Sequence, residues 1–337
     1  MNESPPATWI RPILGRADDM RAEVWLRCGL GAMAETRGGI PVVATGTLTG
    51  PECATAATLT TTVPLVDQGT VVGQPALARG VCTEPGFWTP ELPNLYRAEV
   101  VLRHGDEVVA AGRRMIGLRR LGVKGRSIYL DGRRYVPRGV PSPVDADGLE
   151  AIRRHSAVAV AECPSATDPA AERSLHGFEG LLTHADRIGV AVVMRLSASN
   201  SGMVDTGLLR ERLEVWAAHP SAFLVILPVG LADAAVSIGR RRGSMLLGLE
   251  VEGVEPPPPL PDRGIDTLVV TLPEDGVPHR AWQQPPPLPH VAAIRGGERP
   301  SPTVARAACD RLQSRLAAWA NHDLRDQAWD WAGYLVT

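Results

Sequence analysis

Six acidic side chains lie at or near the ends of short apolar runs in the second half of the chain: Glu162, Glu250, Glu252, Glu274, Asp275 and Glu298. Two carboxyl groups held close together can work as general acid and base, or as acid and nucleophile. The pairs considered for such a role are Glu162 with Glu250 and Glu162 with Glu298. The alternative, which we favour, is that all six are solvated loop carboxylates.

The apolar runs alternate with helical stretches after Val140. Val190–Leu196 precedes a helical pattern at Thr206–Ala218, and Phe223–Leu227 precedes another at Ala232–Arg241. Counting from the run that ends at Val140, eight such runs follow one another, the last at Gly333–Val336. This order predicts a (β/α)8 TIM barrel over residues 122–337, with the acidic residues near its C-terminal mouth.

Two features predict that this barrel is shortened and irregular. The proline-rich stretch Pro256–Pro261 cannot sustain a helix, so we expect a stiff connector in its place. The chain also ends at Thr337, just after the eighth run, without a closing helix. We therefore expect a flank of the incomplete barrel to be covered by a protein partner, a second copy of the chain or the N-terminal segment.

The first part of the chain has a different residue pattern, which is typical of β-strands. Arg21–Cys28 alternates apolar and polar residues, and the runs Tyr96–Leu102 and Glu107–Met115 flank an H-G-D turn. Several short strands with turns about every ten residues are typical of a β-sandwich. The sequence therefore predicts a multidomain β plus α/β protein, with a sandwich over residues 1–121 before the barrel.

The most specific stretch lies at the junction of these domains, Phe87–Val140. It reads F-W-T-P-E-L-P-N-L-Y, then I-G-L-R-R, D-G-R and R-G-V. Its order and spacing resemble glycoside hydrolase family 2, which contains β-galactosidases, β-glucuronidases and β-mannosidases. The matching segments, in order, are Trp88–Tyr96, Ile116–Arg119, Asp131–Arg133 and Arg138–Val140. The resemblance covers roughly residues 85–337 and implies that the sandwich is immunoglobulin-like, while the family's jelly-roll domain has no counterpart here.

The resemblance also implies where two catalytic glutamates should stand. The family's acid/base follows an asparagine at the end of the fourth barrel strand, and counting from His219–Ser221 puts that pair on Val229 and Gly230. The nucleophile ends the seventh strand, where its counterpart is Ile294. Neither glycine nor isoleucine can transfer a proton or attack a sugar. This predicts a degenerate, non-catalytic member of the family.

Other positions are interpreted from the same resemblance. The family's asparagine after R-G-V is Pro141 here, and a substrate-contacting arginine of the second strand corresponds to Ala161. Arg138 is a candidate substrate-binding residue. Trp282, after the sixth run, is a candidate sugar-stacking platform, although a tryptophan of the core or rim is the interpretation that we favour.

Composition excludes several classes of function. A formal charge of −2 gives no reason to expect a nucleic-acid partner. Five cysteines without C-x-x-C spacing, and histidines without ligand spacing, predict no metal site, and no cofactor is implied. There is no G-x-S-x-G turn to support a serine triad. With neither a signal peptide nor a membrane-spanning run, we expect a cytoplasmic protein without membrane association.

Three hypotheses follow. The first, which we prefer, is a degenerate glycosidase-like protein that serves as a binding or assembly module, with a carbohydrate as candidate ligand. The second is an active β-glycosidase whose carboxylates have moved to Glu162, Glu250 or Glu298. The third is an interaction protein whose barrel flank docks onto a protein partner or a second copy.

Overall fold

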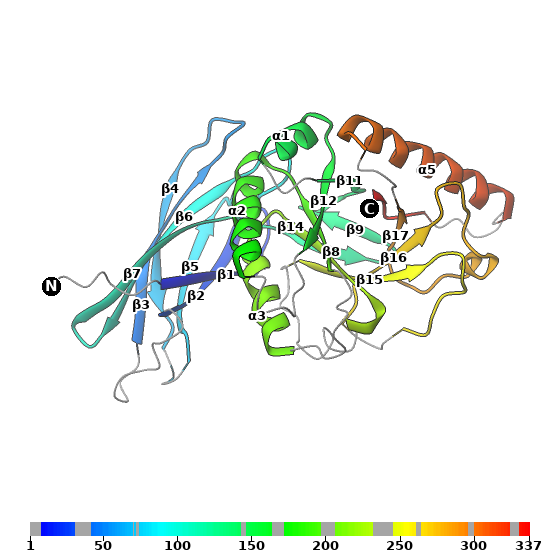
Figure 1. The fold of residues 1–337 in the computed structure, drawn as a ribbon. Coiled ribbons are helices and arrows are strands. Elements are labelled where there is room, and N and C mark those ends of the chain that lie inside the picture. The colour runs from blue at the N-terminus through cyan, green and yellow to red at the C-terminus, as the bar shows by residue number, and fades with distance from the viewer. Residues whose placement is uncertain are drawn as a thin grey trace. The chain divides into compact units, whose positions relative to one another are not determined.

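A computed structural model of the chain describes residues 8–30, 42–69, 71, 74–142, 146–163, 172–196, 206–231, 245–260, 264–295, 300–323 and 330–337. The chain divides into two compact units. The first contains the N-terminal strands up to Arg120, together with Ala218–Pro220. The second contains most of the remainder, from Leu121 to Thr337. Figure 1 shows strands alone in the first unit and both helices and strands in the second.

The first unit is one curled antiparallel sheet with the strand order β1-β2-β5-β4-β3-β6-β7. Strand β4 pairs with β3 along its first half and with β5 through Val66 and Asp67, so it joins the two halves of the sheet. Arg114 on β7 donates a hydrogen bond to the Ile10 carbonyl on β1, which links the two edge strands. The strands are β1 (Thr8–Ala17), β2 (Arg21–Leu30), β3 (Val42–Glu52), β4 (Thr61–Asp67), β5 (Ala76–Thr83), β6 (Leu95–His104) and β7 (Glu107–Ile116).

Alternation along these strands builds the sandwich core. Ala22, Val24, Leu26 and Cys28 of β2 are fully buried, while the residues between them are partly exposed. The same two-residue period runs through β5 and β6, because successive side chains of a strand point to opposite faces. The curled sheet therefore encloses one apolar cluster between its halves.

Buried polar contacts fix the junction motif. The Trp88 amide donates to the Leu118 carbonyl over 2.7 Å, and the Asn94 side chain donates to the Phe87 carbonyl over 3.0 Å. The Tyr96 hydroxyl accepts the Gly86 amide over 2.8 Å, and burial raises the pKa of Tyr96 to about 12. The prolines and aromatics of this motif thus form an internally bonded corner that leads into β6.

The second unit is a closed parallel barrel of eight strands in sequence order, in which β18 pairs with β11. The predicted sandwich followed by a shortened, irregular barrel is therefore confirmed (Figure 1). The strands are β11 (Arg138–Pro141), β12 (Val158–Cys163), β13 (Val192–Leu196), β14 (Ala222–Leu227), β15 (Leu246–Glu252), β16 (Thr267–Leu272), β17 (His290–Ile294) and β18 (Gly333–Val336).

A small three-stranded sheet precedes the barrel: β8 (Leu121–Lys124), β9 (Ser127–Leu130) and β10 (Arg133–Arg134). Tyr135, just after it, packs edge-on against Phe223 with ring centroids 5.3 Å apart. Phe223 stands at an irregularity of the β13–β14 register near the start of β14. Aromatic packing therefore joins this hairpin segment to the N-terminal end of the barrel.

Four α-helices and two short helices lie in the described ranges of the second unit. They are α1 (Ala146–Arg154), α2 (Glu172–Ile188), α3 (Thr206–Trp216) and α5 (Pro302–Asp323), with the short helices η3 (Val229–Leu231) and η4 (Arg280–Gln283). The described part of the proline-rich connector, up to Leu260, contains no helix, as predicted. The helix predicted at Ala232–Arg241 lies outside the described residues. No helix in the described ranges is long and apolar enough to cross a membrane.

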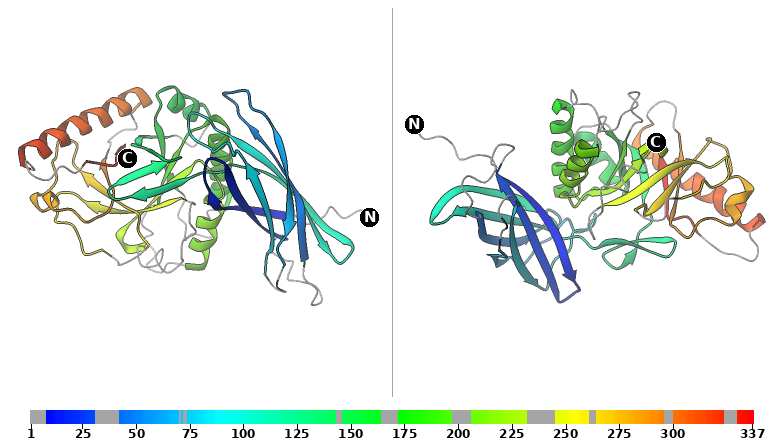
Figure 2. Two further views of the ribbon diagram at one scale, coloured as in Figure 1. Left: turned by 180° about the vertical axis from the view of Figure 1, so that it is seen from behind. Right: turned by 90° about the horizontal axis from the view of Figure 1, so that it is seen from below.

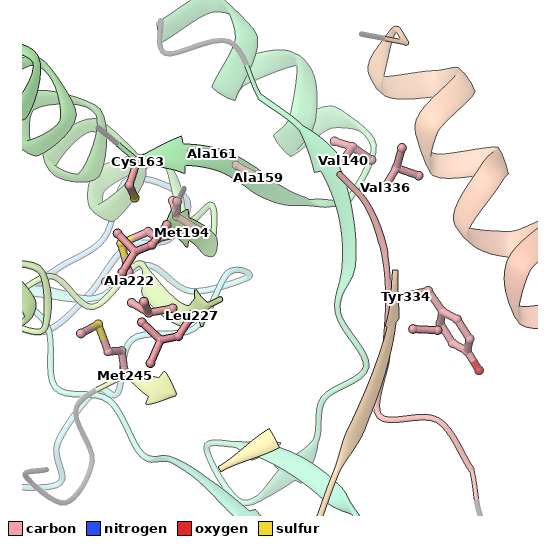
Figure 3. Close-up of a cluster of buried hydrophobic side chains, with 14 of the residues drawn as sticks. Val140, Ala159, Ala161, Cys163, Met194, Ala222, Leu227, Met245, Tyr334 and Val336 are labelled. Atoms are coloured by element: carbon pink, nitrogen blue, oxygen red, sulfur yellow. The ribbon is translucent and has the colours of Figure 1, made fainter. Parts of the chain in front are cut away.

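The flank between β11 and β18, which the sequence left without a closing helix, is contacted by α5. The Cys309 thiol on α5 donates to the carbonyl of Gly139 over 3.3 Å and to that of Tyr334 over 3.5 Å. Figure 3 shows Val140, Tyr334 and Val336 on the side of these strands next to this helix. This flank is therefore packed against a helix of the same chain along α5, and the covering partner stays a prediction.

Alternate residues of the barrel strands face the lumen, and glycines show which ones. A Cβ at Gly139 would lie 2.4 Å from Leu335 and 2.6 Å from Val160, which are the lumen-facing residues of neighbouring strands. A Cβ at Gly248 would lie 3.1 Å from Leu224. The lumen is thus filled by aliphatic side chains, as expected for eight strands. Residues of the opposite parity join the helices in a second apolar cluster, part of which appears in Figure 3.

The crowding at Gly139 gives a test of this packing. We expect Gly139→Ala to lower the free energy of unfolding by about 1–3 kcal/mol, because the added methyl group must displace Leu335 and Val160. Gly122→Ala on β8 is the control, since a Cβ there meets no atom within 4 Å. Urea unfolding of the two variants measures the difference, and equal midpoints would contradict the assigned lumen.

Candidate functional site

Four polar side chains at lumen-facing positions near the C-terminal mouth of the barrel are linked by hydrogen bonds and are here called the mouth cluster: Glu162 on β12, Arg195 on β13, Glu250 on β15 and Thr271 on β16. Arg195 donates through Nη1 to Glu162 over 2.9 Å. It donates through Nε and Nη2 to the two oxygens of Glu250, over 3.1 Å and 3.0 Å. Thr271 adds a hydrogen bond to Glu250 over 3.2 Å. One guanidinium therefore joins two carboxylates from different strands.

Exposure differs across the mouth cluster. The side chain of Glu250 is 12% exposed and that of Glu162 is 47% exposed, with Arg195 between them at 26%. Burial alone lowers the pKa of Arg195, but its hydrogen bonds to Glu250 and Glu162 outweigh burial, so that this pKa is raised. The guanidinium thus remains charged, and Glu250 is the more enclosed of its two carboxylate partners.

This geometry brings together the predicted pair Glu162 and Glu250, but with Arg195 joined to both. A retaining glycosidase places its two carboxyl groups about 5–5.5 Å apart with the sugar between them. Here a guanidinium bonds to both groups and uses both oxygens of Glu250. The arrangement is that of an ion-pair network rather than an open acid/base pair.

None of the other acidic candidates in the described ranges belongs to this hydrogen-bonded group. Glu252 forms a close ion pair with Arg295, and both side chains are largely exposed. Glu274 and Asp275 are exposed residues after β16, and Arg315 lies 3.7 Å from the Asp275 carboxylate. Glu298 lies outside the described residues. Among the residues that the structure describes, no three acidic, histidine or cysteine side chains group as metal ligands.

The two positions predicted for the family's glutamates have different environments. Gly230 lies in η3, just after the fourth strand, and a Cβ there would meet no atom within 4 Å. Ile294 ends the seventh strand, but its buried side chain belongs to the helix-facing cluster. The lumen-facing neighbours at that point are Ala293 and Arg295, and neither is a carboxylate. The position chosen from the sequence is therefore one residue out of phase with the lumen.

Arg138, the candidate substrate-binding residue, contacts α5. It begins β11, at the end of the strand away from the mouth. Its Nε donates to Asp310 on α5 over 3.0 Å, and Nη2 bonds to Gln313 on the same helix. The guanidinium also lies 5.8 Å from the ring centroid of Tyr334. Arg138 therefore joins the barrel wall to α5.

Trp282 lies in η4 and is fully buried, so it presents no ring face on which a sugar could stack. Its indole nitrogen donates to the Glu255 carbonyl over 2.8 Å. Its ring packs edge-on against His290, which also contacts Trp331 with centroids 6.3 Å apart. These contacts support a core role, the interpretation favoured from the sequence. Burial, with a smaller contribution from Arg126, lowers the pKa of His290 to about 3.

Arg195 and Thr271 were not identified from the sequence. A signal for Arg195 was present, because it interrupts the apolar run V-V-M-R-L at a position that a strand of this barrel turns inward. A charged group there requires an opposite charge from another strand. The partner strand, however, is set by the closure of the barrel.

Solved structures of other proteins have an architecture similar to that of this chain. No protein-family profile matches the chain. A β-glucuronidase from Bacteroides uniformis superposes with a TM-score of 0.56 and 14% identity, over 97% of this chain and 45% of that one. A glycosyl hydrolase family 2 member from Bacteroides cellulosilyticus gives 0.59 and 13%, over 97% and 43%.

The fold of this chain is therefore similar to that of these solved structures, one of which is a glycosyl hydrolase family 2 member. The resemblance predicted from the junction motif is thereby confirmed, at identities that establish the fold alone. A stretch of 58 residues is also 41% identical to a β-galactosidase from Klebsiella pneumoniae strain 342, covering 17% of this chain and 6% of that protein. The chain thus spans less than half the length of the family 2 enzymes compared here.

The mouth cluster predicts a stability effect of Arg195. We expect Arg195→Met to lower the free energy of unfolding by about 2 kcal/mol, because the largely buried Glu250 carboxylate loses its cation. Arg295→Met is the matched control on the neighbouring exposed pair, where a loss below about 0.5 kcal/mol is expected. Urea unfolding measures both. Equal losses would show that the cluster is not structurally more important than a surface ion pair.

His290 predicts a pH dependence of stability. Its folded pKa of about 3 lies below its ordinary value of 6.5, so the unfolded chain binds a proton that the folded one excludes. The stability that neutral His290 contributes is fully present above its unfolded pKa of 6.5 and is lost as the pH falls toward its folded pKa of about 3. At pH 5 the loss should be about 2 kcal/mol.

We expect His290→Phe, which keeps an aromatic ring beside Trp282, to remove this part of the acid sensitivity. Urea unfolding at pH 7 and pH 5 compares the two proteins. The same loss on acidification in both would contradict the assignment to His290.

Proposed function

We propose that this chain is a glycoside hydrolase family 2-like protein that is catalytically degenerate and serves as a binding or assembly module. The observation that carries the proposal is the mouth cluster, in which Arg195 bonds to both Glu162 and Glu250. The family's own positions supply no replacement, because the sequence resemblance assigns them to Gly230 and Ile294, and the lumen-facing neighbours of Ile294 are not acidic.

A carbohydrate is the ligand class we propose for the module. The solved structures of the same fold include β-glucuronidases, and Glu162 and Arg195 are exposed enough to hydrogen-bond sugar hydroxyl groups. All five cysteines are free thiols, which supports our proposal of a reducing, cytoplasmic location.

The alternative function is an active β-glycosidase with relocated carboxylates. It is favoured by one observation, that Glu162 and Glu250 come from different strands and meet at the mouth where barrel enzymes carry their catalytic groups. It requires Arg195 to release one carboxylate when substrate binds. The two functions therefore differ in whether that network opens.

Hydrolysis of nitrophenyl β-glycosides separates them. We expect the unmodified protein to release nitrophenol at the rate of buffer, and Glu162→Gln and Glu250→Gln to leave that rate unchanged. Glu274→Gln, at an exposed position outside the mouth cluster, is the control. Hydrolysis that disappears in either mouth variant and survives in the control would establish the alternative. Hydrolysis that survives all three substitutions would contradict both.

A further inference from the structure

The outer face of strands β1, β2 and β5 in the first unit carries an unusual set of side chains. Sheets that cover a core on one side normally present polar residues on the other. Here the outward positions combine tryptophans, aliphatic residues and arginines, all partly exposed: Trp9, Arg11, Ile13, Trp25, Arg27, Leu77, Arg79 and Val81, called the Trp–Arg face. Figure 2 shows β1 and β2 side by side in dark blue.

Both tryptophans of this face lie across glycines of the neighbouring strand. Atoms of the Trp9 ring are 2.3–2.6 Å from where a Cβ of Gly29 would stand. The Trp25 ring nitrogen is 2.9 Å from the corresponding point at Gly15. Any larger residue at these glycines would push the ring away from the sheet. The glycines therefore allow each indole to lie down on the adjacent strand.

Arginines hold both rings. The Arg11 guanidinium lies 4.7 Å from the ring centroid of Trp9, and that of Arg79 lies 5.3 Å from that of Trp25. Arg79 is also fixed by a 2.7 Å ion pair with Glu23. Cation–π contacts and this ion pair reduce the freedom of the rings, which lowers the entropy lost when a ligand binds.

Positive charge concentrates between the two rings. Arg11 and Arg27 are paired directly opposite each other in the β1–β2 register. The Trp9–Gly29 pair lies two residues away in one direction along the strands, and the Ile13–Trp25 pair lies two residues away in the other. Among the outward positions of β2, Arg21 and Arg27 accompany one acidic residue, Glu23. A ligand that reached from one ring to the other would pass over the Arg11–Arg27 pair.

We propose that the Trp–Arg face binds an acidic polysaccharide. Tryptophan offers a flat apolar surface to the C–H face of a sugar ring, and guanidinium groups bind carboxylates through paired hydrogen bonds. The two tryptophans are four residues apart along the strand direction, a separation of roughly 13 Å. That span fits a chain of uronic acid residues rather than a single sugar. The inference is independent of the barrel, since every residue of this face belongs to the first unit.

Titration of the purified protein with polygalacturonate, in low and high salt, tests the proposal. We expect binding that weakens as salt screens the arginines, and no comparable binding to neutral hydroxyethyl cellulose. Trp9→Ala and Trp25→Ala should each weaken binding about tenfold, the size expected for a truncated aromatic anchor. Arg27→Gln should weaken binding and reduce its salt dependence.

Two further variants separate this site from general charge attraction. Arg97→Gln removes one positive charge on β6, outside the Trp–Arg face, and should bind as the unmodified protein does. Gly29→Ala keeps every charge and both tryptophans but displaces the Trp9 ring, so it should weaken binding. Circular dichroism and urea midpoints confirm that each variant is folded. Arg27→Gln, a conservative change at a partly exposed position, keeps the test decisive if a tryptophan variant unfolds.

The proposal would be overturned by any of four results. These are absence of binding, equal binding of the neutral polymer, equal weakening by Arg97→Gln and Arg27→Gln, or tryptophan variants that bind unchanged. Sedimentation velocity adds another: a dimer that disappears in Trp25→Ala would assign the face to a second copy of the chain. None of these outcomes bears on hydrolysis at the barrel mouth.

Discussion

The pleat of the parallel barrel strands is the constraint on which the rest of the second unit depends. Successive side chains face either the lumen or the helices, and an eight-stranded lumen is filled by its own side chains. Lumen-facing positions toward the C-terminal end of each strand therefore lie nearest the mouth. Glu162, Arg195 and Glu250 occupy such positions and meet there, whereas Ile294 has the opposite phase and packs with the helices.

The same constraint places Arg195 between two carboxylates from different strands. Arg195 stands at the end of a strand whose other residues are buried, and it is tolerated because two carboxylates satisfy it. Those carboxylates are one of the pairs that the sequence suggested as relocated catalytic groups. The network that stabilises the barrel mouth thus competes with proton transfer or nucleophilic attack by the same side chains.

The two units expose their polar and aromatic side chains in different places. The barrel places its partly exposed polar groups at one end of a filled lumen, while the sandwich exposes an aromatic and basic surface along three strands. The contrast follows from architecture, because a closed barrel leaves its ends as the accessible places and an open sheet leaves a whole face. The Trp–Arg face and the mouth cluster therefore share no residue.

The sequence by itself determined the order of elements. Period-two strands, the junction motif and eight apolar runs are local patterns, and local patterns are set by neighbouring residues in the chain. Only the tertiary structure decided which acidic residues meet, that Arg195 joins them, that Arg138 faces α5 and that Trp282 is buried. These contacts depend on barrel closure, which brings together residues that are far apart in sequence. They also depend on which face of its strand each side chain occupies, and an error of one residue in the predicted alignment assigns the side chain to the opposite face.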